Sequence, residues 1–216
     1  MLNLLLPAPA GRALRILALG AHPDDIEIGA GGTIVRLLQE RPSAEVRWVV
    51  LSASPERAAE ARAGATALAG RAGRLEIEIG DLPDGRFPAH FEALKDRLEG
   101  LKDGHPDLVL APRLEDRHQD HRLLGEVAWQ TFRDHLVLEY EIPKYDGDTT
   151  AANLYVPLTE EQLAAKLAVL ATAFPSQHGR QWFSEATFRA VARLRGIESN
   201  APSGWAEAFI ARKIVV

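Results

Sequence analysis

The fold is decided by the stretch RILALGAHPDD, which occupies residues 15–25. Its first six residues form a short apolar run closed by Gly20, as in a strand buried on both faces of a parallel sheet. A polar segment, His22 to Asp25, follows directly where such a strand would end. The stretch therefore predicts a central β-strand with metal-binding side-chain types at its carboxyl end.

Strand-like and helix-like segments alternate after this stretch. Apolar, β-branched runs predict strands at 46–51, 75–79, 107–111, 136–142 and 209–216, and the period-two alternation of 75–79 predicts a half-exposed edge strand. Apolar residues at helical spacing, with Ser54 and Thr159 as N-caps, predict helices at 32–41, 55–68, 90–101, 120–135 and 159–174. This alternation predicts one α/β domain over residues 1–216, with a mainly parallel sheet covered on both faces.

Composition and charge exclude several classes of protein. The chain has 25 Lys and Arg against 30 Asp and Glu, a formal net charge of -5, so it has no general attraction for nucleic acid or anionic membranes. No apolar run approaches the roughly 18–20 residues of a membrane span, and the opening segment 1–7 lacks the basic leader of a signal peptide. The absence of cysteine excludes disulfides and thiolate metal sites. We expect a cytoplasmic protein without a membrane span or nucleic-acid partner.

Two short clusters hold an unusual share of the side chains that bind metals. The first is AHPDD at residues 21–25, and the second is HQDH at residues 118–121, just beyond the predicted strand 107–111. In open parallel sheets, ligands bind in the crevice outside the carboxyl ends of the strands. Both clusters lie at such ends, so the predicted topology brings them to the same edge of the sheet.

The residue types in these clusters suit a catalytic metal. A catalytic zinc site has three protein ligands and one open position, and without cysteine the ligands must be imidazole or carboxylate. His22 and Asp25 lie three residues apart in one turn, and His121 can supply a third ligand from the neighbouring loop. Asp24 is then left beside the metal, where a carboxylate suits the general base that deprotonates a metal-bound water.

The second cluster supplies two further candidate residues. His118 suits a group that faces a developing oxyanion or a leaving amine, and Asp120 suits a carboxylate that orients a histidine. Together these parts describe metal-assisted hydrolysis of an acyl bond. Taken alone, HPDD is typical of a turn that caps a helix, and two histidines three residues apart are not the commoner helical metal pair. The metal site is favoured because both clusters lie at predicted strand ends in a cysteine-free chain.

A glycine-rich segment, GAGG at residues 29–32, follows the first cluster. Its place between a strand and a helix invites comparison with dinucleotide-binding loops. The fingerprint of those loops requires a further glycine at position 34, which is Ile34 here. The sequence therefore indicates no nucleotide site.

The two clusters together resemble the motifs of the PIG-L (LmbE-like) zinc deacetylases. AHPDD is followed by a Gly-x-Gly-Gly-Thr segment at 29–33 and then by His-x-Asp-His at 118–121, in the family's order. Weaker similarities are Arg57-x-x-Glu60, the Ser-Gln pair at 176–177, and GWAEAF at 204–209. The chain departs from the family pattern at Ile26, often glutamate in the family, in the loop 52–55, and at Trp205, where tyrosine is more usual.

The resemblance implies a Rossmann-like three-layer fold and a mononuclear site with one zinc per chain, although imidazole and carboxylate also accept other divalent ions. It implies removal of N-acetyl groups from N-acetylglucosamine-type amino sugars or glycoconjugates. The residues carried over are the metal ligands His22, Asp25 and His121, the general base Asp24, the intermediate-stabilising His118, the supporting acid Asp120, and the substrate-binding Arg57.

Two other functions stay open on the sequence. One is a metal-dependent phosphoesterase, which often holds two metals, and the other is a non-catalytic carbohydrate-binding protein. Individual residues also have alternatives: Arg57 suits an i,i+3 pair with Glu60 as well as a substrate contact, and Asp84 with Gly85 is typical of a turn or of a sugar contact. A homo-oligomer is compatible with the sequence.

Overall fold

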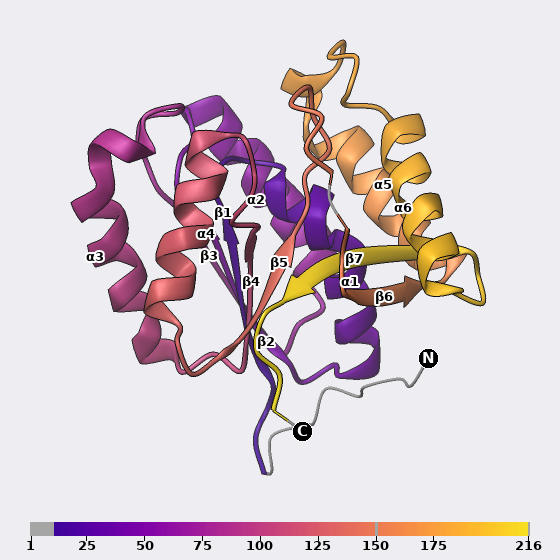
Figure 1. Cartoon of the computed structure of the whole chain (residues 1–216), viewed down its shortest axis with the longest axis horizontal. Coiled ribbons are helices and arrows are strands. Elements are labelled where there is room, and N and C mark those ends of the chain that lie inside the picture. The colour runs from indigo at the N-terminus through magenta and orange to yellow at the C-terminus, as the bar shows by residue number, and fades with distance from the viewer. Residues whose placement is uncertain (1–10, 150, 216) are drawn as a thin grey trace.

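The computed structural model describes residues 11–149 and 151–215, so the opening segment 1–7 lies outside the described residues. Its sheet has seven strands in the order β3-β2-β1-β4-β5-β7-β6 (Figure 1). The strands are β1 (Arg15–Gly20), β2 (Glu45–Val50), β3 (Arg74–Ile79), β4 (Leu108–Pro112), β5 (Leu136–Tyr140), β6 (Leu154–Leu158) and β7 (Trp205–Ala211). The first five run parallel, whereas β7 is antiparallel to both β5 and β6.

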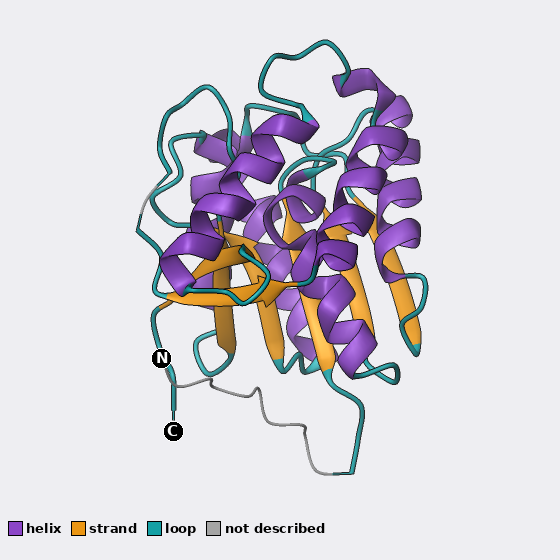
Figure 2. Ribbon diagram, turned by 90° about the vertical axis from the view of Figure 1, so that its right-hand side faces the viewer, coloured by secondary structure: helices purple, strands orange, loops and turns teal. Residues whose placement is uncertain are grey.

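Six α-helices flank the sheet within the described ranges. They are α1 (Asp25–Glu40), α2 (Pro55–Ala69), α3 (Phe91–Leu101), α4 (Gln119–Thr131), α5 (Glu160–Ala173) and α6 (Glu185–Ser199). Helices α3 and α4 cover one face of the sheet, and the other four cover the opposite face (Figures 1 and 2). The predicted three-layer, mainly parallel α/β fold is therefore confirmed. Among the described residues, none of the helices has the length and apolar character needed to cross a bilayer.

The central strand β1 contributes to both apolar cores. Leu17 and Leu19 pack with α3 and α4, whereas Ile16 and Ala18 face the core on the side of α1. All four side chains are at most 2% exposed, because β1 lies between two parallel neighbours and two helical layers. The apolar run of residues 15–20 thus forms the predicted buried strand.

The glycines of segment 29–32 let helix α1 pack closely inside the molecule. A Cβ atom at Gly29 would lie 2.1 Å from the ring of Tyr140, and one at Gly32 would lie 2.5 Å from a methyl group of Leu158. Real Cβ atoms essentially never approach other heavy atoms so closely. Close packing therefore accounts for these glycines without a nucleotide.

Several predicted boundaries are wrong. Helix α1 begins at Asp25, not at Gly32, because a left-handed turn at Asp24 starts the helix directly after β1. Helix α4 ends at Thr131, before the predicted His135, where Phe132 leaves helical geometry (φ -99°, ψ 56°) and inserts its ring into the core. The last strand is Trp205–Ala211 instead of 209–216, and residue 216 lies outside the described residues.

Two elements, β6 and α6, were absent from the sequence prediction. Strand β6 contains Pro157, which is unfavourable inside a sheet but acceptable on the edge strand that β6 forms. Helix α6 carries three arginines, and one of them, Arg195, is buried through an ion pair with Glu141. Both patterns conceal the apolar periodicity from which the other elements were predicted.

The order in which the chain adds strands to the sheet reverses beside β1. From β1 the chain proceeds to β2 on one side and only later reaches β4 on the other side. The carboxyl ends of β1 and β4 are therefore neighbours at a topological switch point, where ligands bind in folds of this kind. Both metal-capable clusters follow these two strands.

Candidate metal and catalytic site

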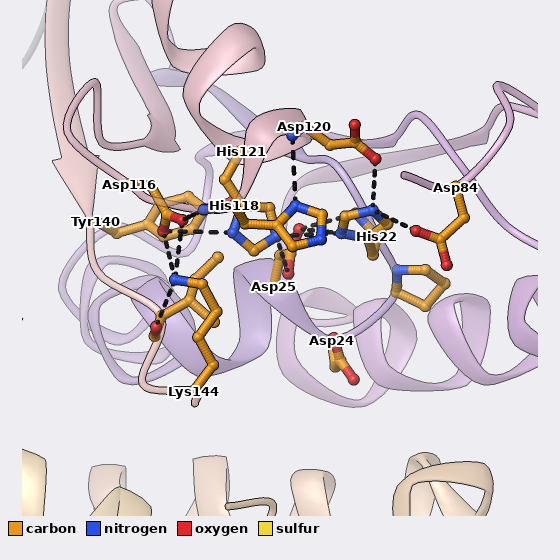
Figure 3. Close-up of polar contacts among 12 residues, drawn as sticks. His22, Asp24, Asp25, Asp84, Asp116, His118, Asp120, His121, Tyr140 and Lys144 are labelled. Atoms are coloured by element: carbon orange, nitrogen blue, oxygen red, sulfur yellow. Dashed lines mark hydrogen bonds and ion pairs between the residues drawn. The ribbon is translucent and has the colours of Figure 1, made fainter. Parts of the chain in front are cut away.

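The two clusters meet in space as predicted (Figure 3). His22 lies in the turn after β1, whereas His118 and His121 lie at the start of α4, after β4. The three imidazole rings have centroids 4.5 to 5.1 Å apart. Residues almost one hundred positions apart thus form one compact group at the switch point.

Asp24 has an unusual backbone conformation at the centre of the first cluster. Its φ angle is 92°, in the left-handed region that residues other than glycine rarely adopt, and it caps helix α1. Such a conformation costs on the order of 1–3 kcal/mol and is found mainly at functional sites. Asp25 starts the helix, and its Oδ2 accepts a hydrogen bond from the His22 backbone N–H at 2.8 Å. The hydrogen bond between His22 and Asp25 and the start of helix α1 therefore fix the turn at residues 22–25.

Three side chains of the site form a small triangle of donor atoms. Nδ1 of His22 lies 3.1 Å from Nε2 of His121. Of the two Asp25 oxygens, Oδ1 lies 3.3 Å from Nε2 of His121 and Oδ2 lies 3.6 Å from Nδ1 of His22. Ligands bound at about 2.0–2.1 Å around a tetrahedral zinc lie about 3.3 Å from one another. The separations between these side chains are therefore close to those that such an ion requires.

The remaining ring nitrogens of these histidines face carboxylates. Nε2 of His22 lies 3.2 Å from Asp120 and 3.1 Å from Asp84, and Nδ1 of His121 lies 3.3 Å from Asp116 (Figure 3). A carboxylate at this position keeps the ring proton on the outer nitrogen, which leaves the lone pair of the inner nitrogen free. In these neutral tautomers two ring nitrogens would offer lone pairs beside the Asp25 carboxylate, so the donor set fits a divalent cation.

Nitrogen atoms of His22, His118 and His121 form a second metal-capable group, within 4.8 Å of one another. However, Nδ1 of His118 accepts the Asp120 backbone N–H at 3.3 Å, which places the proton of the neutral ring on Nε2. Burial and the neighbouring imidazoles lower the pKa of His118, which favours this neutral form. A third group joins His22 with Asp84 and Asp120.

Burial and charge shift the acid strengths of the site. Burial opposes ionisation of Asp25, but the His121 ring outweighs it and holds the pKa of Asp25 well below its usual range. Burial would also lower the pKa of His121, but Asp25 and Asp116 raise it to about 9. By contrast, burial raises the pKa of Asp24 to about 7, although the Arg57 cation opposes the shift. The pKa values of the two adjacent carboxyl groups, Asp24 and Asp25, are thus shifted in opposite directions by their surroundings.

Arg57 reaches this site from helix α2. Its Nη2 donates to the Asp24 carboxylate at 2.9 Å and to the Pro23 carbonyl at 2.5 Å. Its Nη1 donates to Glu60 at 2.6 Å, so the i,i+3 pair considered as an alternative is present. The other partner of Nη1 is Ser176 at 3.0 Å, in the 3-10 turn η3 (Pro175–Gln177).

Two residues of the site, Asp116 and Asp84, were not assigned a role at the metal site from the sequence. Asp116 is fully buried between His121 and Lys144, whose Nζ lies 2.8 Å from its carboxylate. Asp84, which the sequence predicts in a turn or as a sugar contact, lies 3.1 Å from Nε2 of His22. Asp120 is also fully buried and accepts the backbone N–H groups of Gly85 and Phe87, which places the Asp84 loop against the site. The signal for Asp116 was its place two residues before His118.

The family model described as "PIG-L: GlcNAc-PI de-N-acetylase" matches residues 17–132, more than half of the chain and both histidine clusters. The protein belongs to the PIG-L family. This PIG-L protein is 29% identical to the uncharacterized deacetylase YaiS of Escherichia coli (strain K12) over an alignment of 189 positions, and the match covers 79% of this chain and 96% of that relative.

Solved structures share the fold of this PIG-L protein. One is the N,N'-diacetylchitobiose deacetylase of Pyrococcus horikoshii, with a TM-score of 0.68 and 24% identity over 92% of this chain and 84% of the other. Another is GalB, the 4-carboxy-2-hydroxymuconate hydratase of Pseudomonas putida KT2440, with a TM-score of 0.74 and 18% identity over 94% and 98% of the two chains. The fold thus occurs in a deacetylase and in a hydratase, and the reaction must be argued from the site.

Proposed function

We propose that the protein is a zinc-dependent hydrolase that removes the N-acetyl group from an N-acetylglucosamine-type amino sugar or glycoconjugate. The observation that carries this proposal is the close approach of His22 Nδ1, His121 Nε2 and the Asp25 carboxylate, with Asp24 adjacent to Asp25 in the chain. Membership of a family of deacetylases supports the choice of reaction. The similarity to a deacetylase that acts on N,N'-diacetylchitobiose supports the choice of an acetylated sugar.

We assign His22, Asp25 and His121 as the ligands of one metal ion per chain. The hydrogen bond from the Asp120 backbone to His118 favours this set over the group of three histidines, because the only other nitrogen of His118 then carries a proton. Asp116 and Asp120 hold the two ligating histidines in the required tautomers. When bound, a divalent ion would supply Lewis-acid polarisation of the amide carbonyl and acidify a coordinated water.

Asp24 acts as the general base in this proposal. Its carboxylate accepts a proton from the attacking water as the oxygen bonds to the acetyl carbon. The same proton is then delivered to the nitrogen of the amide as the carbon–nitrogen bond breaks, so the products are acetate and a free amine. Burial places the pKa of Asp24 near neutral pH, which suits a group that must both take up and release a proton.

His118 stabilises the charge that develops on the carbonyl oxygen. Its Nδ1 is occupied by the backbone of Asp120, so its Nε2–H is the group available for donation. A preorganised donor of this kind contributes most when its hydrogen bond strengthens as the oxyanion forms. At the mouth of the site, Asp84 has a side chain that is 79% exposed beside His22, where it can accept a hydrogen bond from a sugar hydroxyl.

The proposal is tested with metal-depleted protein to which zinc is returned in measured amounts. We expect amine release from N-acetylglucosamine or N,N'-diacetylchitobiose, and a maximum rate at one zinc per chain. Two bound metals with release of phosphate from a phosphate ester would instead support the phosphoesterase. Sugar binding without amine release by zinc-loaded protein would support the non-catalytic alternative.

A further inference from the structure

We propose that Lys144 is a positioning residue for the metal site, which it supports by holding the Asp116 carboxylate against the ring of His121. The inference rests on the proposed assignment of His121 as a metal ligand. It extends the site to the segment 141–148 between β5 and β6, which lies beyond residues 17–132 matched by the family model. This segment therefore contributes to metal binding without supplying a ligand.

The ammonium group of Lys144 is surrounded by acceptors (Figure 3). Its Nζ lies 2.8 Å from Oδ1 and 2.9 Å from Oδ2 of Asp116. It also lies 3.3 Å from the Ile142 carbonyl and 3.3 Å from Oδ2 of Asp148. An ammonium group carries three N–H bonds, and three acceptor groups surround it here. The side chain is 9% exposed, so the cation is directed at Asp116 and at its own segment.

The Asp116 carboxylate connects this cation to the metal site. Its Oδ1 accepts the backbone N–H of His118 at 2.8 Å, and its Oδ2 lies 3.3 Å from Nδ1 of His121. Lys144 contacts both oxygens, so it fixes the rotation of the carboxylate and with it the direction of Oδ2. Asp116 is fully buried, so bulk water cannot replace the cation. Loss of Lys144 would leave a buried charge without its counter-ion and free the carboxylate to turn away from His121.

A second ion pair holds the segment 141–148 against the loop between β4 and α4. Oδ2 of Asp148 lies 2.9 Å from Nη2 of Arg113 and accepts the backbone N–H of Arg117 at 2.8 Å. The side chains of Arg113, Asp116, Lys144 and Asp148 are all at most 9% exposed. Two of them follow β4 and two follow β5, and their two positive and two negative charges balance. This buried cluster therefore joins the segment after β5 to the loop that leads into α4.

Zinc titration against a chelating dye tests the role of Lys144 without a substrate. For Lys144→Met we expect the zinc affinity to fall about 3- to 10-fold, less than the 10–100-fold typical of a direct partner of a ligating histidine. Lys144→Arg keeps the positive charge and should bind zinc within about twofold of wild type. Asp148→Ala removes the far anchor of Lys144 and should lower the affinity about 3-fold. Wild-type affinity in both Lys144→Met and Asp148→Ala would overturn the inference.

A double-mutant cycle shows whether Lys144 acts through Asp116. If it does, the double variant Lys144→Met with Asp116→Ala should bind zinc within about twofold of Asp116→Ala alone. The double variant has neither charge of this ion pair, so it serves even where Lys144→Met folds poorly. A further loss of zinc affinity in the double variant would show that Lys144 acts by another route, and would overturn the inference.

Lys166→Met is the matched control for general destabilisation. It makes the same substitution at another buried ion pair, in which Nζ of Lys166 lies 2.6 Å from Glu207. It should destabilise the fold but leave the zinc affinity within about twofold of wild type, because the two sites are independent. A fall in zinc affinity equal to that of Lys144→Met would attribute both effects to destabilisation and overturn the positioning role.

The same measurements distinguish this inference from the proposed function. If the Lys144 variants behave as expected but the zinc-loaded wild type releases no amine, the positioning role stands and the proposed deacetylase activity fails. If the wild type releases amine but Lys144→Met and Asp148→Ala bind zinc normally, only the positioning role fails. If His121→Ala binds zinc as tightly as the wild type, the ligand assignment and the role of Lys144 fail together.

Discussion

The Nδ1 nitrogen of His22 lies 3.1 Å from the Nε2 nitrogen of His121. At this separation an N–H of one ring can donate to the lone pair of the other, so the two nitrogens lie within hydrogen-bonding distance. The carboxylates on the far sides of both rings favour the tautomers in which the facing nitrogens carry lone pairs, and a cation between them would take the place of the shared proton. The pair therefore has a spacing that suits two ligands of one metal ion.

The first prediction concerns metal content. His121→Ala and Asp25→Ala should each lose bound zinc during dialysis, because each removes one vertex of the donor triangle. His118→Ala should retain about one zinc per chain, since its ring is held by the Asp120 backbone. Mass spectrometry of protein purified without a metal-binding tag measures the stoichiometry. Loss of zinc in His118→Ala with full retention in Asp25→Ala would replace Asp25 by His118 in the ligand set.

The second prediction concerns the general base. Asp24→Asn keeps the size of the side chain but removes its capacity to accept a proton, so kcat should fall by about 10²–10⁴-fold. Zinc content should stay at the wild-type value, because Asp24 lies outside the donor triangle. Amine release at a wild-type rate by zinc-loaded Asp24→Asn would remove Asp24 from the mechanism.

The third prediction concerns Asp116. This buried carboxylate lies 3.3 Å from Nδ1 of His121, and Asp116→Ala removes the group that orients the ring. Loss of such a partner typically lowers metal affinity by 10–100-fold. Zinc titration against a chelating dye measures the change. Asp134→Ala, which removes an exposed carboxylate beyond the end of α4, is the control and should bind zinc like the wild type.

The fourth prediction concerns the stability of the fold. Nζ of Lys166 lies 2.6 Å from the Glu207 carboxylate, and both side chains are 5% exposed. Glu207 also accepts the backbone N–H groups of Gly32 and Thr33 in α1. Lys166→Met leaves a buried charge without its counter-ion and should reduce the free energy of unfolding by about 3–5 kcal/mol.

Urea denaturation measures that loss. The double variant Lys166→Met with Glu207→Gln should recover part of it, since the unpaired charge is then absent as well. Lys102→Met, at an exposed ion pair with Glu99, should change stability by no more than about 0.5 kcal/mol. An equally small effect of Lys166→Met would show that water or another group compensates the Glu207 charge.

The fifth prediction concerns pH. Burial opposes ionisation of Asp107, but hydrogen bonds from the Arg12 side chain and the Arg15 backbone outweigh it and lower the pKa of Asp107 below 3.8. The folded protein therefore binds this proton less readily than the unfolded chain does. The resulting stabilisation is present above about pH 4 and is lost as the pH falls through the folded-state pKa.

Asp107→Asn should accordingly be less stable than wild type at pH 7, and the difference should shrink below about pH 4. Urea denaturation at a series of pH values provides the comparison. A difference between the two proteins that stays constant from pH 7 to pH 3 would contradict this assignment.

The sequence predicted the elements whose apolar pattern is local. β1 and α2 follow directly from their residues, and the edge position of β3 follows from its period-two alternation. The meeting of His22 with His121 was also predictable, because parallel strands place their carboxyl ends at one edge. These inferences need only short-range patterns and a general rule of topology.

Other features depend on partners distant in the sequence. Asp116 is near His118 in sequence, but its environment is completed by Lys144 from the segment after β5. Helix α6 buries Arg195 only because Glu141 lies opposite. The four acceptors of Arg57 come from three separate segments, so its i,i+3 pairing with Glu60 revealed only one of them. No local pattern encodes these pairings.

The left-handed backbone of Asp24 places a strained turn at the residue whose side chain the proposed chemistry requires. A glycine would adopt φ 92° without steric cost, so Asp24→Gly would relax the turn while abolishing the proposed chemistry. The same replacement would also take away the carboxylate partner of the largely buried Arg57, so the loss of this ion pair would offset the relief of strain. Engineering of this scaffold should therefore leave residue 24 fixed and seek added stability elsewhere in the sheet and its helices.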